Sequence, residues 1–409
     1  MKKITISVMF SLMCFVNVKA VSNPFIHLDS LSLAKTKIMI ENGTASKETL
    51  AAYKKLLKDA DNLLKISNPT VVDKTILPPT QNKHDYLSIS RYWWPNTETK
   101  DGLPWVRHDG KTNPDTQTDA VDRPRLSLMA KGVWNLSLAY YFTNNEKYAE
   151  KAISMIDTWF LNEATRMNPH LEYAQSVPGN NNKRPSGILD GRVIVMYVPD
   201  AINLLSISKY WNKNYQTKAK KWFTDYLNWL TTSDLGIKGS KQENNHGSWY
   251  KFQVAGLALY VGDTALVKST VKLAEISLNE MLNDEGGQIH ELARSRSFFY
   301  SCFNLQALTN IAILGEKVGI DMWQYKSDTN KSLFLALNYL VSVVNGKQWD
   351  YSILKDIDFS ELIPIISELA KKYNSEEYKN LLLKIIDSNT ESNKMEAFWL
   401  LNTIDIKSN

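Results

Sequence analysis

The 409-residue chain predicts an all-α fold, in which antiparallel helical hairpins stack side by side and curl into a toroid or barrel. Apolar residues recur at helical spacing through most of the chain. The connections between these segments are often short and carry helix-end signals. No strand-rich segment suggests a separate β domain, so one domain over residues 21–409 is the simplest organisation.

Three segments show the helical periodicity most clearly. They are Glu146–Leu161, Thr217–Thr231 and Thr264–Asn283, and in each the large apolar side chains fall on one face of a helix. Further helices are expected over residues 29–41, 46–66, 124–142, 190–211, 242–261, 298–319, 328–345, 359–373, 375–387 and 392–402.

Several connections carry the residues that end one helix and begin the next. Gly262 offers a glycine stop and Asp263 an N-cap. The residues Thr143-Asn144-Asn145 link two helices in the same way. The run Ser240-Lys241-Gln242-Glu243 has the pattern of a capping box, which predicts that the Asn-Asn-His run after it lies in the first turns of a helix.

Two long segments, residues 67–122 and 162–189, interrupt the helical pattern. Both are rich in turn-forming residues, and aromatic residues are embedded in them. Loops of this length within a domain are usually functional or disordered. The aromatic residues favour order, so we expect these loops to form the walls of a cleft.

Residues 1–20 have the features of a secretory signal peptide. Lys2 and Lys3 precede a mostly apolar stretch, and Val18-Lys19-Ala20 is a plausible cleavage site. The apolar stretch is too short to span a bilayer. The sequence therefore predicts an exported protein, periplasmic or secreted, with no membrane span. Cys302 would then be the only cysteine left, so no internal disulfide is expected.

The charge balance does not indicate a nucleic-acid partner. The formal net charge is +5, and removal of the three lysines of the leader, with no acidic residue, gives 5 − 3 = +2. An anionic ligand would have to be attracted by a local basic cleft. The 12 Trp and 19 Tyr can stack on sugars, although many must belong to the core.

Two clusters carry residues suited to carbanion chemistry. The run Asn244–Tyr250 supplies an amide and an imidazole, and Arg294, Arg296 and Tyr300 supply guanidinium groups and a phenol. Amide and guanidinium groups can neutralise a carboxylate and stabilise the enolate formed beside it. His or Tyr can move the proton. The alternatives are a capped helix with a buried histidine and a solvated basic turn.

Other chemistries have less support from the residues. No two of the six histidines lie three or four positions apart, so no metal site is expected. Glycine-rich phosphate loops are absent. A glycoside hydrolase that pairs Asp190 with another acid stays open, because such carboxylates pair in space and not in sequence. A non-catalytic sugar-binding protein stays open as well.

Four stretches together resemble the alginate lyase superfamily, in particular secreted Bacteroidetes-type members that attack alginate or glucuronan. These are Tyr86–Asn113, Met167–Pro169, Asn244–Gly247 and Arg294–Asn304. The resemblance covers nearly the whole chain after the leader. It implies a lyase domain with an (α/α)-toroid or incomplete (α/α)-barrel and a long cleft for an anionic polysaccharide. It also implies metal-independent β-elimination without a cofactor, on mannuronate-rich alginate first or on glucuronan.

The resemblance also implies roles for individual residues. Asn245 and Arg294 would hold the carboxylate, with Arg296 as the competing arginine, and Tyr300 would protonate the leaving oxygen. His246 is the base if H5 and O4 lie on opposite faces, as in guluronate, and Tyr300 can be both base and acid if they share a face, as in mannuronate. A tyrosine base needs its pKa lowered from about 10, which a neighbouring arginine favours.

The residues expected to bind the polymer are Tyr92, Trp93, Trp94, Arg192, Tyr250 and Arg296. Arg91, Lys183 and Arg184 are further cations that could meet carboxylates along the polymer.

Overall fold

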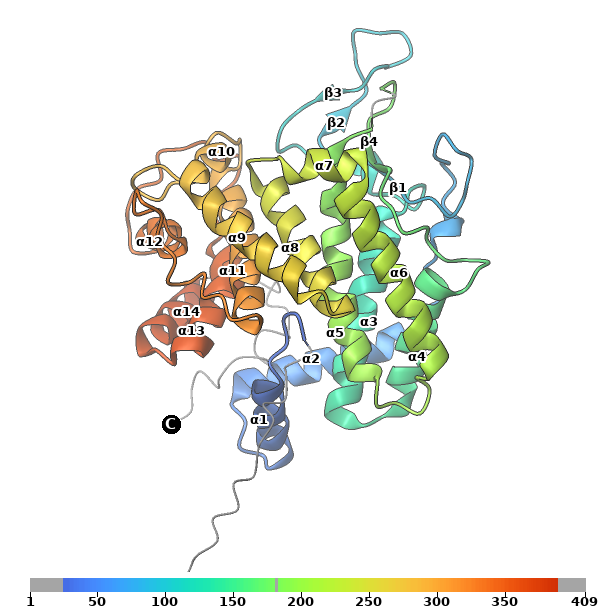
Figure 1. Cartoon of the computed structure of the whole chain (residues 1–409), viewed down its shortest axis with the longest axis horizontal. Helices are drawn as coiled ribbons and strands as arrows, with labels where there is room; N and C mark the ends of the chain where they lie inside the picture. Colours follow the sequence, from blue (N-terminus) through green and yellow to red (C-terminus); the bar gives the residue numbers. More distant parts are fainter. Residues whose placement is uncertain (1–24, 181–182, 389–409) are drawn as a thin grey trace, which may run out of the picture.

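The computed structural model describes residues 25–180 and 183–388, which are mostly helical (Figure 1). Helices that are neighbours in sequence pack against each other, and together they form the expected (α/α)-toroid. The α-helices are α1 (Ser30–Glu41), α2 (Lys47–Leu63), α3 (Arg123–Thr143), α4 (Glu146–Ile156), α5 (Arg192–Leu205), α6 (Lys213–Thr232), α7 (Asp234–Ser240), α8 (Asn245–Val261), α9 (Thr264–Met281), α10 (Ile289–Leu292), α11 (Ser297–Lys317), α12 (Leu333–Val344), α13 (Ile363–Tyr373) and α14 (Glu376–Ser388).

The core follows the longest helices. Helix α3 packs on α4 and α5, and α8 packs on α6, α9 and α11. Large apolar side chains such as Trp249 and Phe252 on α8 are fully buried in this core. Helix α8 is therefore a fixed element, and the residues at its first turn have a well-defined position.

The two helix-end signals around α8 had different outcomes. Gly262 adopts φ +94 and ends α8, and the Asp263 side chain caps α9, as predicted. The capping box at Ser240 is wrong, because Ser240 ends the short helix α7 and Asn244 caps α8 instead. Asn245 and His246 are nevertheless the first two residues of α8, where the sequence placed them.

Most other boundaries differ by a few residues. The helix expected at 190–211 begins as a 3₁₀ turn, Pro185–Gly191, and becomes α5 only at Arg192. The helix expected at 328–345 starts at Leu333, because Ser332 caps it. The helix expected at 359–373 begins with a 3₁₀ turn, Phe359–Leu362, and the helix expected at 146–161 ends with a π turn, Asp157–Leu161. The leader and the helix expected at 392–402 lie outside the described residues. No helix in the described part is long and apolar enough to cross a bilayer.

Four short strands bring the two long loops together at one end of the helices (Figure 1). Strands β1 (Leu87–Ile89) and β4 (Tyr173–Ser176), one from each loop, pair in parallel. Strands β2 (Trp93–Trp94) and β3 (Val106–Arg107) form an antiparallel hairpin within the first loop. The described parts of both loops thus lie together over this end.

Asp200 ties the start of the described chain to the core. Its buried carboxylate on α5 accepts the backbone N–H groups of Ile26, His27 and Leu28 at 2.5 to 3.0 Å. Burial raises the pKa of Asp200 to about 6, although these bonds and Lys317 act to lower it.

We expect Asp200→Ala to lower the free energy of unfolding by roughly 3–5 kcal/mol, because it leaves three backbone N–H donors, of which those of Ile26 and Leu28 are buried, without their acceptor. Chemical denaturation measures this loss. Asp200→Asn keeps an acceptor and should lose less. Because the folded-state pKa lies above the ordinary 3.8, the wild-type carboxyl contributes most below pH 3.8 and loses that contribution as the pH rises through about 6. The free energy of unfolding of Asp200→Asn, relative to that of wild type, should therefore be higher at pH 8 than at pH 4. An equal difference at both pH values would contradict this linkage.

Candidate active site

A cavity of about 380 Å³ opens where the two loops meet the first turn of α8. It gathers Asn245, His246, Arg294 and Tyr300, the four residues expected to be catalytic, from the start of α8, from the segment between α10 and α11, and from the first turn of α11. The remaining lining residues are Ser90, Arg91, Tyr92, Trp93, Arg107, Arg123, Gln175, Arg184, Ser186, Leu189, Arg192, Gln242, Asn244, Phe299 and Phe303.

The lining is strongly cationic. Arg91, Arg107, Arg123, Arg184, Arg192 and Arg294 line this cavity, and no Asp or Glu of the described chain is among its lining residues. Arg91, Arg123 and Arg192 also line an adjoining cavity of about 300 Å³. A cleft lined by charges of one sign concentrates ligands of the opposite sign, so the site suits a polyanion.

Asn245 is completely buried and is held by Glu291 of α10. Its backbone N–H donates to Oε1 of Glu291 at 2.6 Å, and its side-chain Nδ2 lies 3.1 and 2.9 Å from the two carboxylate oxygens. The other end of the amide, Oδ1, is buried without a hydrogen-bond partner.

His246 is neutral at pH 7. Burial, followed by the charges of Arg294 and Arg184, lowers its pKa from 6.5 to about 4. Its Nδ1 is buried and has no hydrogen-bond partner, while the residue lines the cavity. A neutral imidazole facing an anion-binding cavity can accept a proton from a ligand.

Arg294 is held by Asp109, which follows β3. Its Nη2 and Nε donate to the Asp109 carboxylate at 2.7 and 3.2 Å, and Ser295 donates to the same group. Burial alone would raise the pKa of Asp109, but the bonds from Arg294 and Ser295 hold it well below its usual range. The Arg294 guanidinium lies 3.7 Å from the centre of the Tyr300 ring, a cation–π contact that fixes both side chains.

Tyr300 donates its hydroxyl to the hydroxyl of Tyr92 at 2.7 Å. Burial, and then Tyr92, raises the pKa of Tyr300 above its ordinary value, while Arg294 acts in the opposite direction. The arginine therefore acts in the expected direction, but desolvation of the phenol outweighs it, so the pKa of Tyr300 is raised. Tyr300 is protonated in the free protein and can act as an acid.

The residues expected to bind the polymer separate into two groups. Tyr92, Trp93 and Arg192 line the cavity. The guanidinium of Arg184 lies over the Trp93 ring at 5.3 Å, and that of Arg192 lies near the rings of Trp249 and Phe303. These aromatic contacts hold two of the arginines at the wall of the cavity.

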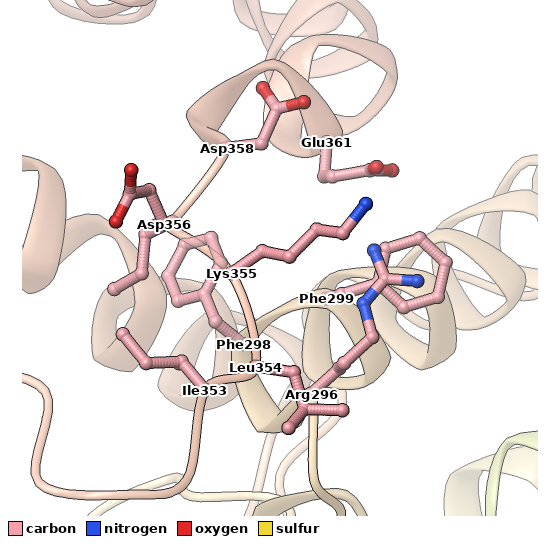
Figure 2. A pocket seen from close by; sticks show the side chains of 10 residues that line it. Arg296, Phe298, Phe299, Ile353, Leu354, Lys355, Asp356, Asp358 and Glu361 are labelled. Carbon is pink, nitrogen blue, oxygen red and sulfur yellow. The ribbon is translucent and has the colours of Figure 1, made fainter. Parts of the chain in front are cut away.

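Trp94, Tyr250 and Arg296 lie off this cavity, against expectation. Trp94 donates to the carbonyl of Lys111, and the hydroxyl of the buried Tyr250 donates to the carbonyl of Leu230. Arg296 lies over the Phe299 ring at 4.3 Å and lines a different cavity of about 190 Å³ (Figure 2). Of the two competing arginines, Arg294 is the one whose guanidinium lies over the Tyr300 ring.

Asp190, the acid considered for a hydrolase, is a buried structural group. It accepts hydrogen bonds from Tyr86, Ser88 and Gln175 and lies 3.4 Å from a nitrogen of Arg123. It lines the adjoining cavity and not the one that holds Tyr300. This position removes the acid that the hydrolase alternative needed at the site.

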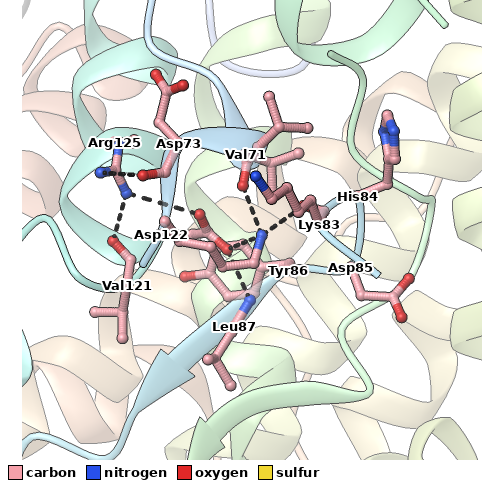
Figure 3. A network of polar contacts seen from close by, with 12 residues as sticks. Val71, Asp73, Lys83, His84, Asp85, Tyr86, Leu87, Val121, Asp122 and Arg125 are labelled. Atoms are coloured by element: carbon pink, nitrogen blue, oxygen red, sulfur yellow. Dashed lines mark hydrogen bonds and ion pairs between the residues drawn. The ribbon is translucent and has the colours of Figure 1, made fainter. Parts of the chain in front are cut away.

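A buried network anchors the loop that delivers Arg91 and Tyr92 to the cavity (Figure 3). Asp122, just before α3, accepts the backbone N–H of Leu87 on β1 and pairs with Lys74 at 3.0 Å. Burial raises the pKa of Asp122 to about 6 and lowers that of Lys74, so desolvation outweighs the attraction on both sides. Since a buried pair of this kind adds little net stability, we assign it a positional role for β1.

Asp109 and Glu291 were not predicted from the sequence. Both lie in or beside stretches that were singled out, Asp109 within Tyr86–Asn113 and Glu291 three positions before Arg294. Nothing in their spacing shows that each contacts a side chain of the cavity.

In the described residues, no group of three or more His, Cys, Asp or Glu is placed to hold a metal ion.

A helical toroid with an arginine-lined cavity that presents an amide, an imidazole, a guanidinium and a phenol defines a polysaccharide lyase acting on uronate polymers. The model of the alginate lyase family matches residues 70–349, and the chain belongs to this family.

Solved structures agree with this assignment. An alginate lyase from Bacteroides ovatus is 33% identical, with a TM-score of 0.86 over 94% of this chain and 100% of that chain. Alginate lyase A1-III from Sphingomonas species A1 is 16% identical, with a TM-score of 0.58 over 87% of this chain and 90% of that one, which shows the shared fold. A histidine variant of that enzyme is known in complex with a tetrasaccharide. No curated protein matches the chain.

Proposed function

We propose that the enzyme cleaves alginate, with mannuronate-rich chains as the first candidate and glucuronan as the second, by β-elimination without a cofactor. The observation that carries this proposal is the convergence of Asn245, His246, Arg294 and Tyr300 on one arginine-lined cavity. The similarity to the alginate lyase from Bacteroides ovatus supports alginate as the polymer.

In the proposed reaction, Asn245 and Arg294 bind the carboxylate of the uronate at the +1 position. This is the sugar that loses H5 and whose C4–O bond breaks. Loss of H5 breaks the C5–H bond and places charge on the carboxylate, which these two groups stabilise. The C4–O bond then breaks, a C4=C5 double bond forms, and Tyr300 gives its proton to the glycosidic oxygen. Electrons and protons balance without any further reactant.

The protonation states support different roles for the two proton carriers. His246 is neutral and can accept H5, and Tyr300 carries the proton that the leaving oxygen needs. Mannuronate and glucuronate differ only at C2, and in both H5 and O4 lie on the same face of the ring. A single group near these two atoms could therefore act first as the base and then as the acid. Tyr300 could do so only after losing its proton, and the hydroxyl of Tyr92 at 2.7 Å could then donate to the phenolate.

The pH dependence of kcat at saturating polymer distinguishes the two bases. If His246 is the base, activity should rise on the acid side with an apparent pKa near 4 and stay level through neutrality, because burial lowers the imidazole pKa to about 4. If Tyr300 is the base, activity should keep climbing into the alkaline range, because its pKa is raised. Initial rates from pH 3.5 to 10 on one polymer, with enzyme stability checked at each pH, separate these profiles.

The central test is an ultraviolet absorbance assay on polymannuronate, polyguluronate and glucuronan. Elimination creates a C=C bond conjugated to the carboxylate, so its product absorbs ultraviolet light. Hydrolysis gives only reducing ends. Absorbing product from polymannuronate or glucuronan is the expected result. Reducing ends without absorbance would establish a hydrolase, and polymer binding with neither product would establish a binding protein.

We further propose that residues 1–20 direct export and are removed after Ala20, on the basis of the basic start, the apolar stretch and the Val18-Lys19-Ala20 site. Expression of the full chain in a Gram-negative host, followed by N-terminal sequencing of the periplasmic protein, should give Val21 as the first residue. Retention in the cytoplasm with Met1 intact would contradict the proposal.

A further inference from the structure

Glu291 is a buried acidic group that contacts Asn245 behind the wall of the arginine-lined cavity. It is 1% exposed, and all the hydrogen bonds found for its carboxylate come from the backbone and side chain of Asn245. Among the described residues, no lysine, arginine or histidine lies within ion-pair distance of it. A carboxylate that is buried and lacks a cation is costly to keep ionised.

The ionisation of Glu291 determines which end of the Asn245 amide faces the ligand. An ionised carboxylate only accepts hydrogen bonds, so it selects the observed orientation, with Nδ2 toward Glu291 and Oδ1 without a partner. In that orientation at most one amide hydrogen is left for a substrate carboxylate. A protonated Glu291 can donate to Oδ1, and the amide can then turn so that both Nδ2 hydrogens face the cavity.

A bound uronate would place a second carboxylate on the same amide. Two carboxylates that share one partner in a desolvated site do not both stay ionised. The charged groups facing Glu291 do not prevent this. On the segment before α11, Arg294 is committed to Asp109, and on α8 His246 is neutral, while His290 on α10 lies 3.5 Å from Glu243.

We propose that Glu291 is a positioning residue that takes up one proton from solvent as the uronate binds, and thereby turns the Asn245 amide to donate both hydrogens to the uronate carboxylate. This inference rests on the proposed function, because it requires that Asn245 holds that carboxylate. Burial favours the same outcome, since it raises the pKa of Glu291, against the opposing effects of the Asn245 bonds and Arg294.

Proton uptake changes binding and leaves the chemical step unaffected. Above the pKa of Glu291 in the free enzyme, polymer affinity should fall with rising pH by up to about tenfold per unit. The dependence should appear in KM and be weak in kcat at saturating polymer. A purely structural role for Glu291 would produce no such split.

The test is calorimetric binding of mannuronate oligomers to the Tyr300→Phe form, in which we expect turnover to be too slow to interfere, in two buffers of different ionisation enthalpy. We expect net proton uptake near pH 7.5, reduced by one proton per site when Glu291→Gln is added. The glutamine Nε2 donates permanently to Oδ1, so Glu291→Gln should keep binding and activity and should lose the rise of KM at high pH. Glu291→Leu offers neither a donor nor an acceptor to Asn245, so this variant should lose polymer binding and activity. Its circular dichroism reports whether it folds.

Equal proton uptake with and without Glu291→Gln would overturn the inference, as would a glutamine variant that folds but no longer binds. These outcomes differ from failure of the proposed function, in which the wild type yields no absorbing product from any uronate polymer. Wild-type activity combined with unchanged proton uptake would reject the role of Glu291 alone.

Discussion

Tyr300→Phe should lower the rate of unsaturated product formation by about 10²–10⁴-fold, the usual contribution of a positioned acid or base. The substitution removes only the hydroxyl that is placed to protonate the leaving oxygen. The ring should keep its place, because the Arg294 guanidinium still lies over it. The absorbance assay measures the rate, and calorimetry with oligomers measures binding, which should change little.

The matched control is Tyr250→Phe. Tyr250 is also buried, but its hydroxyl donates to the carbonyl of Leu230 and does not reach the cavity. It should therefore keep near wild-type activity with a small loss of stability. Tyr92→Phe removes the hydrogen-bond partner of Tyr300 and should give a smaller loss than Tyr300→Phe. Full activity in Tyr300→Phe would remove this residue from the mechanism.

The sequence predicted the parts of the site that depend on local rules. A glycine stop at Gly262 and apolar periodicity identify the helices around the cavity, and both are confirmed. The position of Asn245 and His246 in the first turn of α8 was correct, although the cap is Asn244 and not Ser240. These features depend on residues within a few positions of each other in the chain, so a sequence alone can show them.

Features that depend on distant contacts were not predicted. Strand β1 pairs with β4 across more than eighty positions, and neither strand is long enough to show an alternating pattern. Asp109 likewise contacts Arg294 only in the folded chain, where the loop after β3 lies against the segment between α10 and α11. The raised pKa of Tyr300 depends on how deeply the ring is buried, which is a property of the whole fold.

Arg294→Gln should lower kcat/KM by about 10²–10³-fold, or roughly 3–4 kcal/mol of transition-state stabilisation. The guanidinium is the cation positioned against Tyr300, where it can offset the charge that develops on the uronate carboxylate. Much of the loss should appear in kcat, since the remaining arginines of the cavity still attract the polymer. Arg294→Lys keeps the charge but loses the fork that binds Asp109, so we expect an intermediate rate.

Arg296→Gln is the matched control, because Arg296 lies two positions away in sequence yet lines a different cavity. It should retain most of the wild-type activity, whereas a loss as large as that of Arg294→Gln would make Arg296 the neutralising group. Stability must be measured alongside, because Arg294→Gln also removes a partner of Asp109. That carboxylate keeps its bonds from Ser295 and Arg107, so the fold should survive. A folded, polymer-binding Arg294→Gln enzyme with little turnover would then locate its defect in the stabilisation of the enolate.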